Sequence, residues 1–163
     1  MSTVAMRRET AGTFYQQLLQ LTRPANFALP LLQILAGYCI AGGMVQDPSW
    51  TLYVLIGVAF LLHGGFTIFN DLADRRVDIA NQVNTLITKG SGRQLRSIAC
   101  IAGAMIAVAL VASLLLPDRV QLIVLLTCLM SVTYNHKPVQ LSHKPLRSIA
   151  GLAVLYGLLP LYL

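Results

Sequence analysis

Five apolar runs dominate this sequence of 163 residues and restrict the folds open to it. We predict membrane-spanning helices over residues 26–45, 50–69, 97–116, 120–134 and 148–163. A helix needs about 20 apolar residues to cross about 30 Å of hydrocarbon. Alternating strand patterns do not occur, and backbone polar groups in lipid must be paired within the protein. The sequence therefore predicts an all-α, multi-pass transmembrane bundle of about five helices.

The composition agrees with a membrane protein. Apolar residues make up 56% of the chain and charged residues 11%, against roughly 45–50% and 25% in soluble domains. These proportions exclude a disordered chain and an ordinary soluble enzyme. We expect an integral membrane protein of the cytoplasmic or plasma membrane that contacts lipid and has no nucleic-acid partner.

The basic residues indicate an orientation. With a cytoplasmic N-terminus, eleven of the twelve Lys and Arg residues fall on the cytoplasmic side, and only Arg119 falls outside. Such a bias is typical of cytoplasmic loops. The cytoplasmic segment 70–96 is also long and polar, whereas the outer segments are short turns, so we expect the functional site to face the cytoplasm. Residues 1–22, basic and then apolar, are expected to form an interfacial segment.

Acidic residues gather directly after the second run, where residues 70–78 read Asn-Asp-Leu-Ala-Asp-Arg-Arg-Val-Asp. If the helix continues, Asp71, Asp74 and Asp78 lie within an arc of about 60°. Three like charges on one face favour a cation between them, and carboxylate oxygens suit Mg²⁺. Because Mg²⁺ often shares its coordination shell with phosphate oxygens, we expect a phosphorylated or diphosphorylated substrate.

A second interpretation of the acidic cluster needs no metal. Arg75 and Arg76 lie between the carboxylates and can form intrahelical pairs with them at a solvated helix end. Such pairs contribute only a few tenths of a kcal/mol each. The position of the cluster beside a long apolar helix, in a chain with six acidic residues, favours the metal site.

The pattern NDxxDxxxD at residues 70–78 resembles the first Asp-rich motif of the UbiA superfamily of intramembrane prenyltransferases. The resemblance covers nearly the whole chain. Residues 23–26, Arg-Pro-Ala-Asn, are similar to the RPxN-like start of that family's first helix, and Tyr134 falls where the family commonly has a Tyr followed by basic residues.

The resemblance implies Mg²⁺-dependent transfer of a polyprenyl group from an allylic polyprenyl diphosphate to an aromatic or other lipophilic acceptor, in quinone or isoprenoid lipid biosynthesis. It implies that Asp71, Asp74 and Asp78 are catalytic and hold the metal. The candidate substrate-binding residues are Asn26, Asn70, Lys89, Arg93, Tyr134, Lys137 and Arg147.

Two features depart from the family pattern. Thr85 and Leu86 stand where an Arg and a Pro are frequent, and no Asp or Glu follows Asp118, so the second Asp-rich motif is absent from this sequence. We therefore expect residues 1–163 to form a single, truncated membrane domain and an incomplete catalyst, with a C-terminal half or a second chain supplying the other metal ligands.

Other functions remain open at this point. One alternative is a catalytically inactive membrane partner or pseudoenzyme that has kept the Asp-rich motif. A CDP-alcohol phosphotransferase fits less well, because its motif needs a Gly directly after the first Asp and Asp71 is followed by Leu72. A transporter is also disfavoured, since His63 is the one ionisable residue within the predicted spans.

Overall fold

The computed structural model describes residues 14–40, 49–82 and 85–135, and every regular element in these ranges is helical. Residues 14–21 are helical and lead into a short 3-10 turn. The elements are η1 (Pro24–Phe27), α2 (Ala28–Ile40), α3 (Trp50–Ala80), α4 (Leu86–Lys89), α5 (Gly92–Ser113) and α6 (Asp118–Asn135). The all-α prediction is confirmed, while the predicted span 148–163 lies outside the described ranges.

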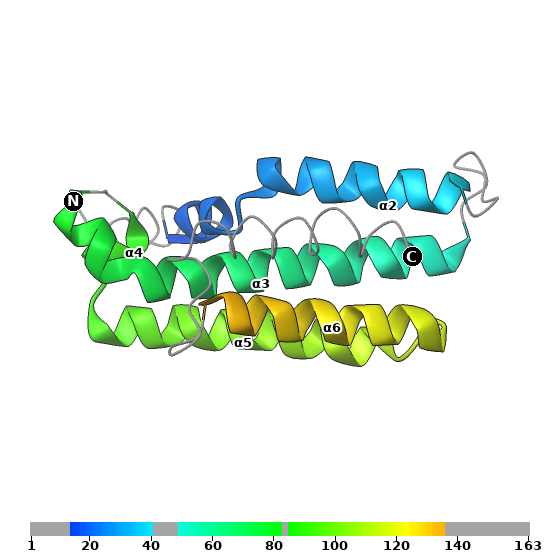
Figure 1. The fold of residues 1–163 in the computed structure, drawn as a ribbon. Coiled ribbons are helices and arrows are strands. Elements are labelled where there is room, and N and C mark those ends of the chain that lie inside the picture. Colours follow the sequence, from blue (N-terminus) through cyan, green and yellow to red (C-terminus); the bar gives the residue numbers. More distant parts are fainter. Residues whose placement is uncertain (1–13, 41–48, 83–84, 136–163) are drawn as a thin grey trace, which may run out of the picture.

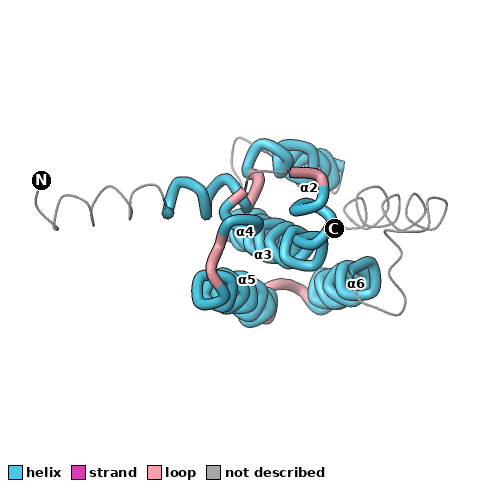
Figure 2. The backbone as a smooth tube through the Cα atoms, turned by 90° about the vertical axis from the view of Figure 1, so that its left-hand side faces the viewer, coloured by secondary structure: helices cyan, strands magenta, loops and turns pink. Residues whose placement is uncertain are grey.

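Helix α3 forms the centre of the bundle (Figure 1). Figure 2, in which the long helices are seen nearly end-on, shows α3 between α2 on one side and α5 and α6 on the other. Its contact with α5 is the most extensive, and it also contacts α2, α4 and α6. At one end of the bundle α3 and α5 extend beyond the described parts of α2 and α6, and α4 joins them there (Figure 1).

The helices agree with the predicted spans but differ from them at their ends. Within the described ranges, α3 and α5 are long and apolar enough to cross a membrane. Helix α3 starts at Trp50 as predicted but continues to Ala80, so the first half of the polar segment 70–96 is helical. The helix predicted from residue 26 begins instead at Ala28, because the preceding residues form η1.

Side chains of the described helices form two apolar clusters. The larger one joins α2, α3, α5 and α6 around Ile34, Val58 and Ala109. The second lies near the end that carries α4 and contains Leu21, Ile68, Ile87, Ile98 and Ala102. Many large apolar side chains face outward, among them Leu32, Trp50, Tyr53, Val111, Leu122 and Leu129. Such a surface is unfavourable in water and suits contact with lipid.

The helix at residues 14–21 runs crosswise to the bundle, as a comparison of Figures 1 and 2 shows. Phe14 and Leu18 pack against the cluster around Ile68, while Tyr15 and Leu19 are exposed. One apolar face therefore fixes this helix to the bundle, and a second apolar strip stays uncovered. The crosswise direction agrees with the interfacial segment predicted for residues 1–22, which remains a prediction.

Two glycines allow α3 and α5 to approach closely. A Cβ atom added at Gly65 would lie 2.7 Å from Cγ1 of Ile106 and 3.1 Å from the carbonyl oxygen of Ala102. At Gly64 the added atom would lie 2.7 Å from the terminal methyl of Met105. Small residues permit this kind of packing between membrane helices, where dispersion contacts stabilise association.

We predict that Gly65→Ala destabilises the bundle by about 1–3 kcal/mol, because a backbone oxygen and a β-branched side chain must move. Gly57→Ala is the matched control in the same helix, since an added Cβ there has no atom within 4 Å. The control should be neutral or stabilising by up to about 1 kcal/mol. Thermal unfolding in detergent, followed by circular dichroism, measures both variants; equal stabilities would contradict the close contact.

Candidate functional site

The acidic cluster lies where α3 continues beyond its apolar run. The helix has 31 residues and is therefore about 46 Å long, whereas a hydrocarbon core is about 30 Å thick. If the run that ends at Phe69 crosses the membrane, the remaining turns lie beyond the core. Because α3 is unbroken through Ala80, the expected helical spacing of Asp71, Asp74 and Asp78 is present.

Asp71 forms an ion pair with Arg23, a residue 48 positions earlier in the chain. Nη2 of Arg23 donates a hydrogen bond to Oδ1 of Asp71 at 2.7 Å. The Asp71 side chain is 10% exposed and that of Arg23 is 50% exposed. An ion pair with one partner half in water contributes about 0–1 kcal/mol to stability. The main effect of this ion pair is therefore to fix the position of the Asp71 side chain.

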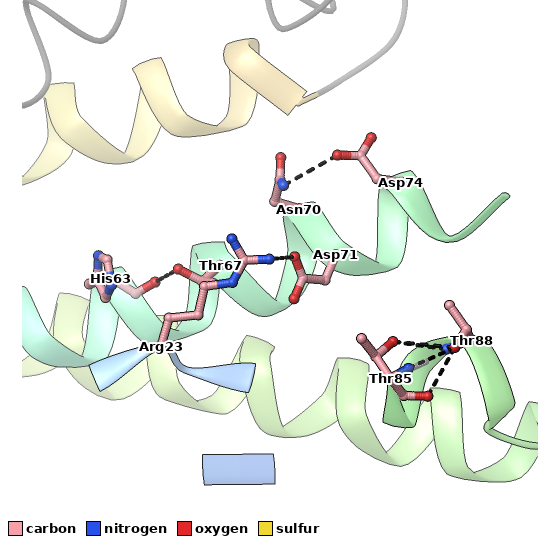
Figure 3. A network of polar contacts seen from close by, with 8 residues as sticks. All are labelled: Arg23, His63, Thr67, Asn70, Asp71, Asp74, Thr85 and Thr88. Carbon is pink, nitrogen blue, oxygen red and sulfur yellow. Dashed lines mark hydrogen bonds and ion pairs between the residues drawn. The ribbon is translucent and has the colours of Figure 1, made fainter. Parts of the chain in front are cut away.

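The other polar side chains of the cluster have a different arrangement. Nδ2 of Asn70 donates to Oδ2 of Asp74 at 3.3 Å. Figure 3 shows these two side chains reaching towards each other while Asp71 is turned towards Arg23. Asp74 and Asp78 still act on Asp71 as like charges. Within the described ranges no group of three or more Asp, Glu, His or Cys side chains is arranged so that it could hold a metal ion.

Arg75 does not neutralise the carboxylates in this structure. Its Nε donates at 2.9 Å to the carbonyl oxygen of Ile87, whose side chain is fully buried. This bond fastens α4 to α3.

Thr85 and Thr88 form a capping box at the start of α4, in which each side chain bonds the backbone of the other residue (Figure 3).

A pocket of about 370 Å³ lies between the crosswise helix, α3, α4 and the start of α5. It brings the Arg23–Asp71 pair together with Lys89, one of the candidate substrate-binding residues. The remaining lining residues include both polar and apolar ones: Gln17, Gln20, Leu21, Thr85, Leu86, Gly90 and Gln94. The pocket thus combines one buried carboxylate, two cations and amide side chains that bind oxygen-rich groups.

The structure gathers some of the predicted site residues and separates others. Asn70, Asp71, Asp74 and Asp78 share the end of α3, and Lys89 lines the pocket with Asp71. Asn26, in η1, and Arg93, in the first turn of α5, are exposed and do not line that pocket. Tyr134 belongs to α6, though its side chain is not among those described, and Lys137 and Arg147 lie outside the described ranges.

Sequence reasoning did not assign Arg23 to the site. Arg23 enters the sequence analysis only as one of the eleven basic residues of the cytoplasmic side and as the first residue of the motif Arg-Pro-Ala-Asn. The structure gives it a left-handed backbone conformation, with φ 47° and ψ 57°, directly before η1. This conformation is uncommon for a residue other than Gly or Asn. The sequence signal for Arg23 is that a basic residue stands directly before a Pro at a helix start. That signal does not identify Asp71 as its partner.

His63 lies on α3 two turns before Asn70. Its ring centroid is 5.7 Å from that of Phe27, and its carbonyl oxygen accepts a bond from Oγ1 of Thr67 at 2.7 Å. These contacts place His63 against η1 rather than in the pocket lined by Asp71. In the described structure its ring therefore lies between η1 and α3.

The chain is thus an all-α membrane protein with a pocket at one end of the bundle that is lined by one carboxylate, Asp71, and two cations, Arg23 and Lys89. The model of the UbiA prenyltransferase family matches residues 31–163, and the chain belongs to that family. Membership supports prenyl transfer in general, in a membrane-embedded protein. Comparisons with curated proteins and with solved structures gave no match.

We predict that Arg75→Ala loosens α4 locally. Losing one charge-assisted bond to a buried carbonyl should raise amide hydrogen exchange at residues 87–89 about five- to tenfold. Mass spectrometry of the peptides covering α4 measures this. Arg76→Ala is the control, because Arg76 is exposed and has no ion pair among the described residues. Equal exchange in the two variants would show that Arg75 does not hold α4.

Proposed function

We propose that the end of α3 binds the diphosphate of an allylic polyprenyl substrate together with Mg²⁺, for transfer of the polyprenyl group to an aromatic or other lipophilic acceptor in quinone or isoprenoid lipid biosynthesis. The observation that carries the proposal is the pocket lined by Asp71, Arg23 and Lys89, at the end of α3 that also carries Asp74 and Asp78 outside the pocket lining. Membership of the UbiA prenyltransferase family supports it independently.

Carboxylate oxygens are the chemistry that Mg²⁺ prefers, although the described side chains form no group of three ready ligands. Asp71, Asp74 and Asp78 offer carboxylate oxygens on consecutive turns of one helix, and Mg²⁺ is commonly held by one or two carboxylates plus water and substrate phosphate. A closed protein cage is therefore not required. When bound, the ion stabilises negative charge on the leaving diphosphate. Asn70 supports the site by holding Asp74 through its amide.

The cations Arg23 and Lys89 would bind the diphosphate of the substrate. Lys89 and Arg23 lie on the walls of the pocket from different elements, so a diphosphate between them can be bound from two sides. Breaking the bond between the allylic carbon and oxygen leaves the electron pair on the diphosphate, and positive side chains stabilise that charge. The apolar residues Leu21 and Leu86 lie in the same walls.

We also propose an orientation of the chain in the membrane and a number of membrane crossings. The basic residues of the end that carries α4 include Arg75, Arg76, Lys89, Arg93 and Arg96, whereas Arg119 lies at the start of α6. A cytoplasmic position for the pocket follows the usual distribution of charge. We propose a multi-pass domain of about five crossings, with the site on the cytoplasmic side.

Because no acidic residue follows Asp118, the appropriate test is binding rather than turnover. We predict that the chain in detergent binds a non-hydrolysable geranyl diphosphate analogue in a Mg²⁺-dependent manner, measured by calorimetry. Asp74→Asn removes one carboxylate charge with little change in shape and should weaken that binding at least about tenfold.

Asp118→Asn is the matched control, because it makes the same substitution at the other end of the bundle, where α6 begins. It should leave the affinity unchanged within about twofold. Binding that is indifferent to Mg²⁺, or weakened equally by the two substitutions, would contradict the proposal. A folded chain that binds nothing would instead support the inactive membrane partner.

A further inference from the structure

We propose that the crosswise helix at residues 14–21 lies in the interfacial layer of the membrane, with the apolar strip formed by Tyr15 and Leu19 in the lipid, and that this contact holds in place the wall that the same helix gives to the pocket. The partner of the strip is thus the lipid surface itself. The inference goes beyond the proposed function, because it does not depend on which ligand the pocket binds. The depth of the helix, its direction and the arrangement of its side chains carry it.

Two neighbouring elements fix the depth of the crosswise helix at the boundary of the apolar region. Its side chains pack in the cluster around Ile68, directly before the apolar run of α3 ends at Phe69. Closely after the helix, Arg23 bonds Asp71, which follows Phe69 by less than one turn. Helix α2, which has no charged residue, then begins at Ala28. The end of one apolar helix and the start of another therefore place the crosswise helix at the same level, where the hydrocarbon layer ends.

The direction of the helix suits this level. Figures 1 and 2 show it crosswise to α2 and α3, so it lies along the boundary where these two helices leave it. The chain turns between the two directions at Arg23, whose backbone is left-handed, and at Pro24. At the end of the helix the carbonyl oxygen of Leu19 accepts from the amide of Thr22 at 3.2 Å and from its Oγ1 at 2.7 Å. A polar group that needs a partner close to lipid is thus bonded within the chain.

The side chains of the helix differ between two opposite flanks. At about 100° per residue, Tyr15 and Leu19 lie on one flank, and Gln17 and Gln20 lie about 150° away from them. Tyr15 is 69% exposed and Leu19 58% exposed, whereas the two glutamines line the pocket. When the pocket opens to water, the apolar strip on the other flank therefore faces the lipid. Tyrosine is frequent at the level of the headgroups, and leucine is typical of the apolar face of interfacial helices.

The lipid contact affects the pocket because one short helix carries both flanks. Residues 14–21 form only about two turns, and a helix of this length is not stable in water without packing. The bundle covers the side that carries Phe14, Leu18 and Leu21. Lipid around the strip supplies a second apolar contact. Without it, the wall that contains Gln17 and Gln20 should open more often.

The first test locates the strip by the fluorescence of a single tryptophan in the full chain in lipid nanodiscs. Trp50, the one native tryptophan, is replaced in Trp50→Phe, and Leu19→Trp is added. Phosphatidylcholine brominated near the carbonyl end of its acyl chains should quench this tryptophan at least about threefold more than that of Gln17→Trp, the matched control on the opposite flank.

Equally weak quenching of the two tryptophans would overturn the proposal. Blue-shifted emission at position 19 without quenching by bromine would also overturn it, because protein would then cover the strip, either residues 1–13 or a second copy of the chain.

The second test follows the pocket wall. Tyr15→Gln combined with Leu19→Gln makes the strip polar, and amide hydrogen exchange at residues 17–21 in nanodiscs should rise about tenfold. Tyr15→Phe combined with Leu19→Met is the matched control: it keeps the strip apolar and should change exchange less than about twofold. Mass spectrometry of the peptides covering this helix measures both. Unchanged exchange in the glutamine pair, or an equal rise in the control, would show that the lipid contact does not hold the wall.

Leu19→Gln alone separates lipid contact from packing within the protein and serves if the double variant does not fold. It leaves the edge contact of the Phe14 and Tyr15 rings, with centroids 5.8 Å apart, unchanged. We expect a rise of about threefold in exchange at residues 17–21. Exchange equal to that of the parent chain in this variant would overturn the role of the strip.

Discussion

The length of α3 is the constraint on which the rest of the structure depends. A helix of 31 residues exceeds the thickness of a hydrocarbon core by roughly 16 Å, or about three turns. Its apolar part packs against α5 through Gly64 and Gly65. Its last turns carry the acidic face beyond the apolar region. One continuous element therefore connects the buried core of the bundle to the candidate site.

The site is completed by two segments that contact the end of α3. The crosswise helix leads to Arg23, which bonds Asp71. Helix α4 is attached by Arg75 and delivers Lys89 to the same pocket. Both segments also contribute apolar side chains, Leu21 and Ile87, to one cluster. Packing in that cluster and charge in the pocket are thus linked, so a change in either affects the same small region.

Much of the fold followed from the sequence, because apolar runs long enough to cross a membrane leave few alternatives to helices. The beginning of α3 was predicted at about Trp50, where it is found, and the helical spacing of the acidic residues required only that the helix continue. The left-handed turn at Arg23 and the 3-10 helix after it were not predicted. Local composition shows that a helix begins near a Pro, but it does not give the backbone conformation of the residue before that Pro.

The site was predicted less completely, for a physical reason. The acidic residues lie on one helix, so their relation follows from helical geometry. The cations come from separate elements, and the Arg23–Asp71 pair joins residues 48 positions apart. The sequence could not rank Lys89 against Arg93, since both follow α3 closely. Both side chains are exposed, but packing of α4 places Lys89 on the pocket wall, which Arg93 does not line. Arg75, expected among the carboxylates, is bonded to α4 instead.

The central claim is that the acidic end of α3 holds a metal ion and a substrate diphosphate together. Pulsed electron–nuclear double resonance of Mn²⁺ in the nanodisc-bound chain with geranyl thiolodiphosphate tests this claim most directly. The account predicts a Mn²⁺ signal, distinct from that of the free complex, with strong coupling to ³¹P. A protein-bound Mn²⁺ without ³¹P coupling, or only the spectrum of the free Mn²⁺–diphosphate complex, would contradict it.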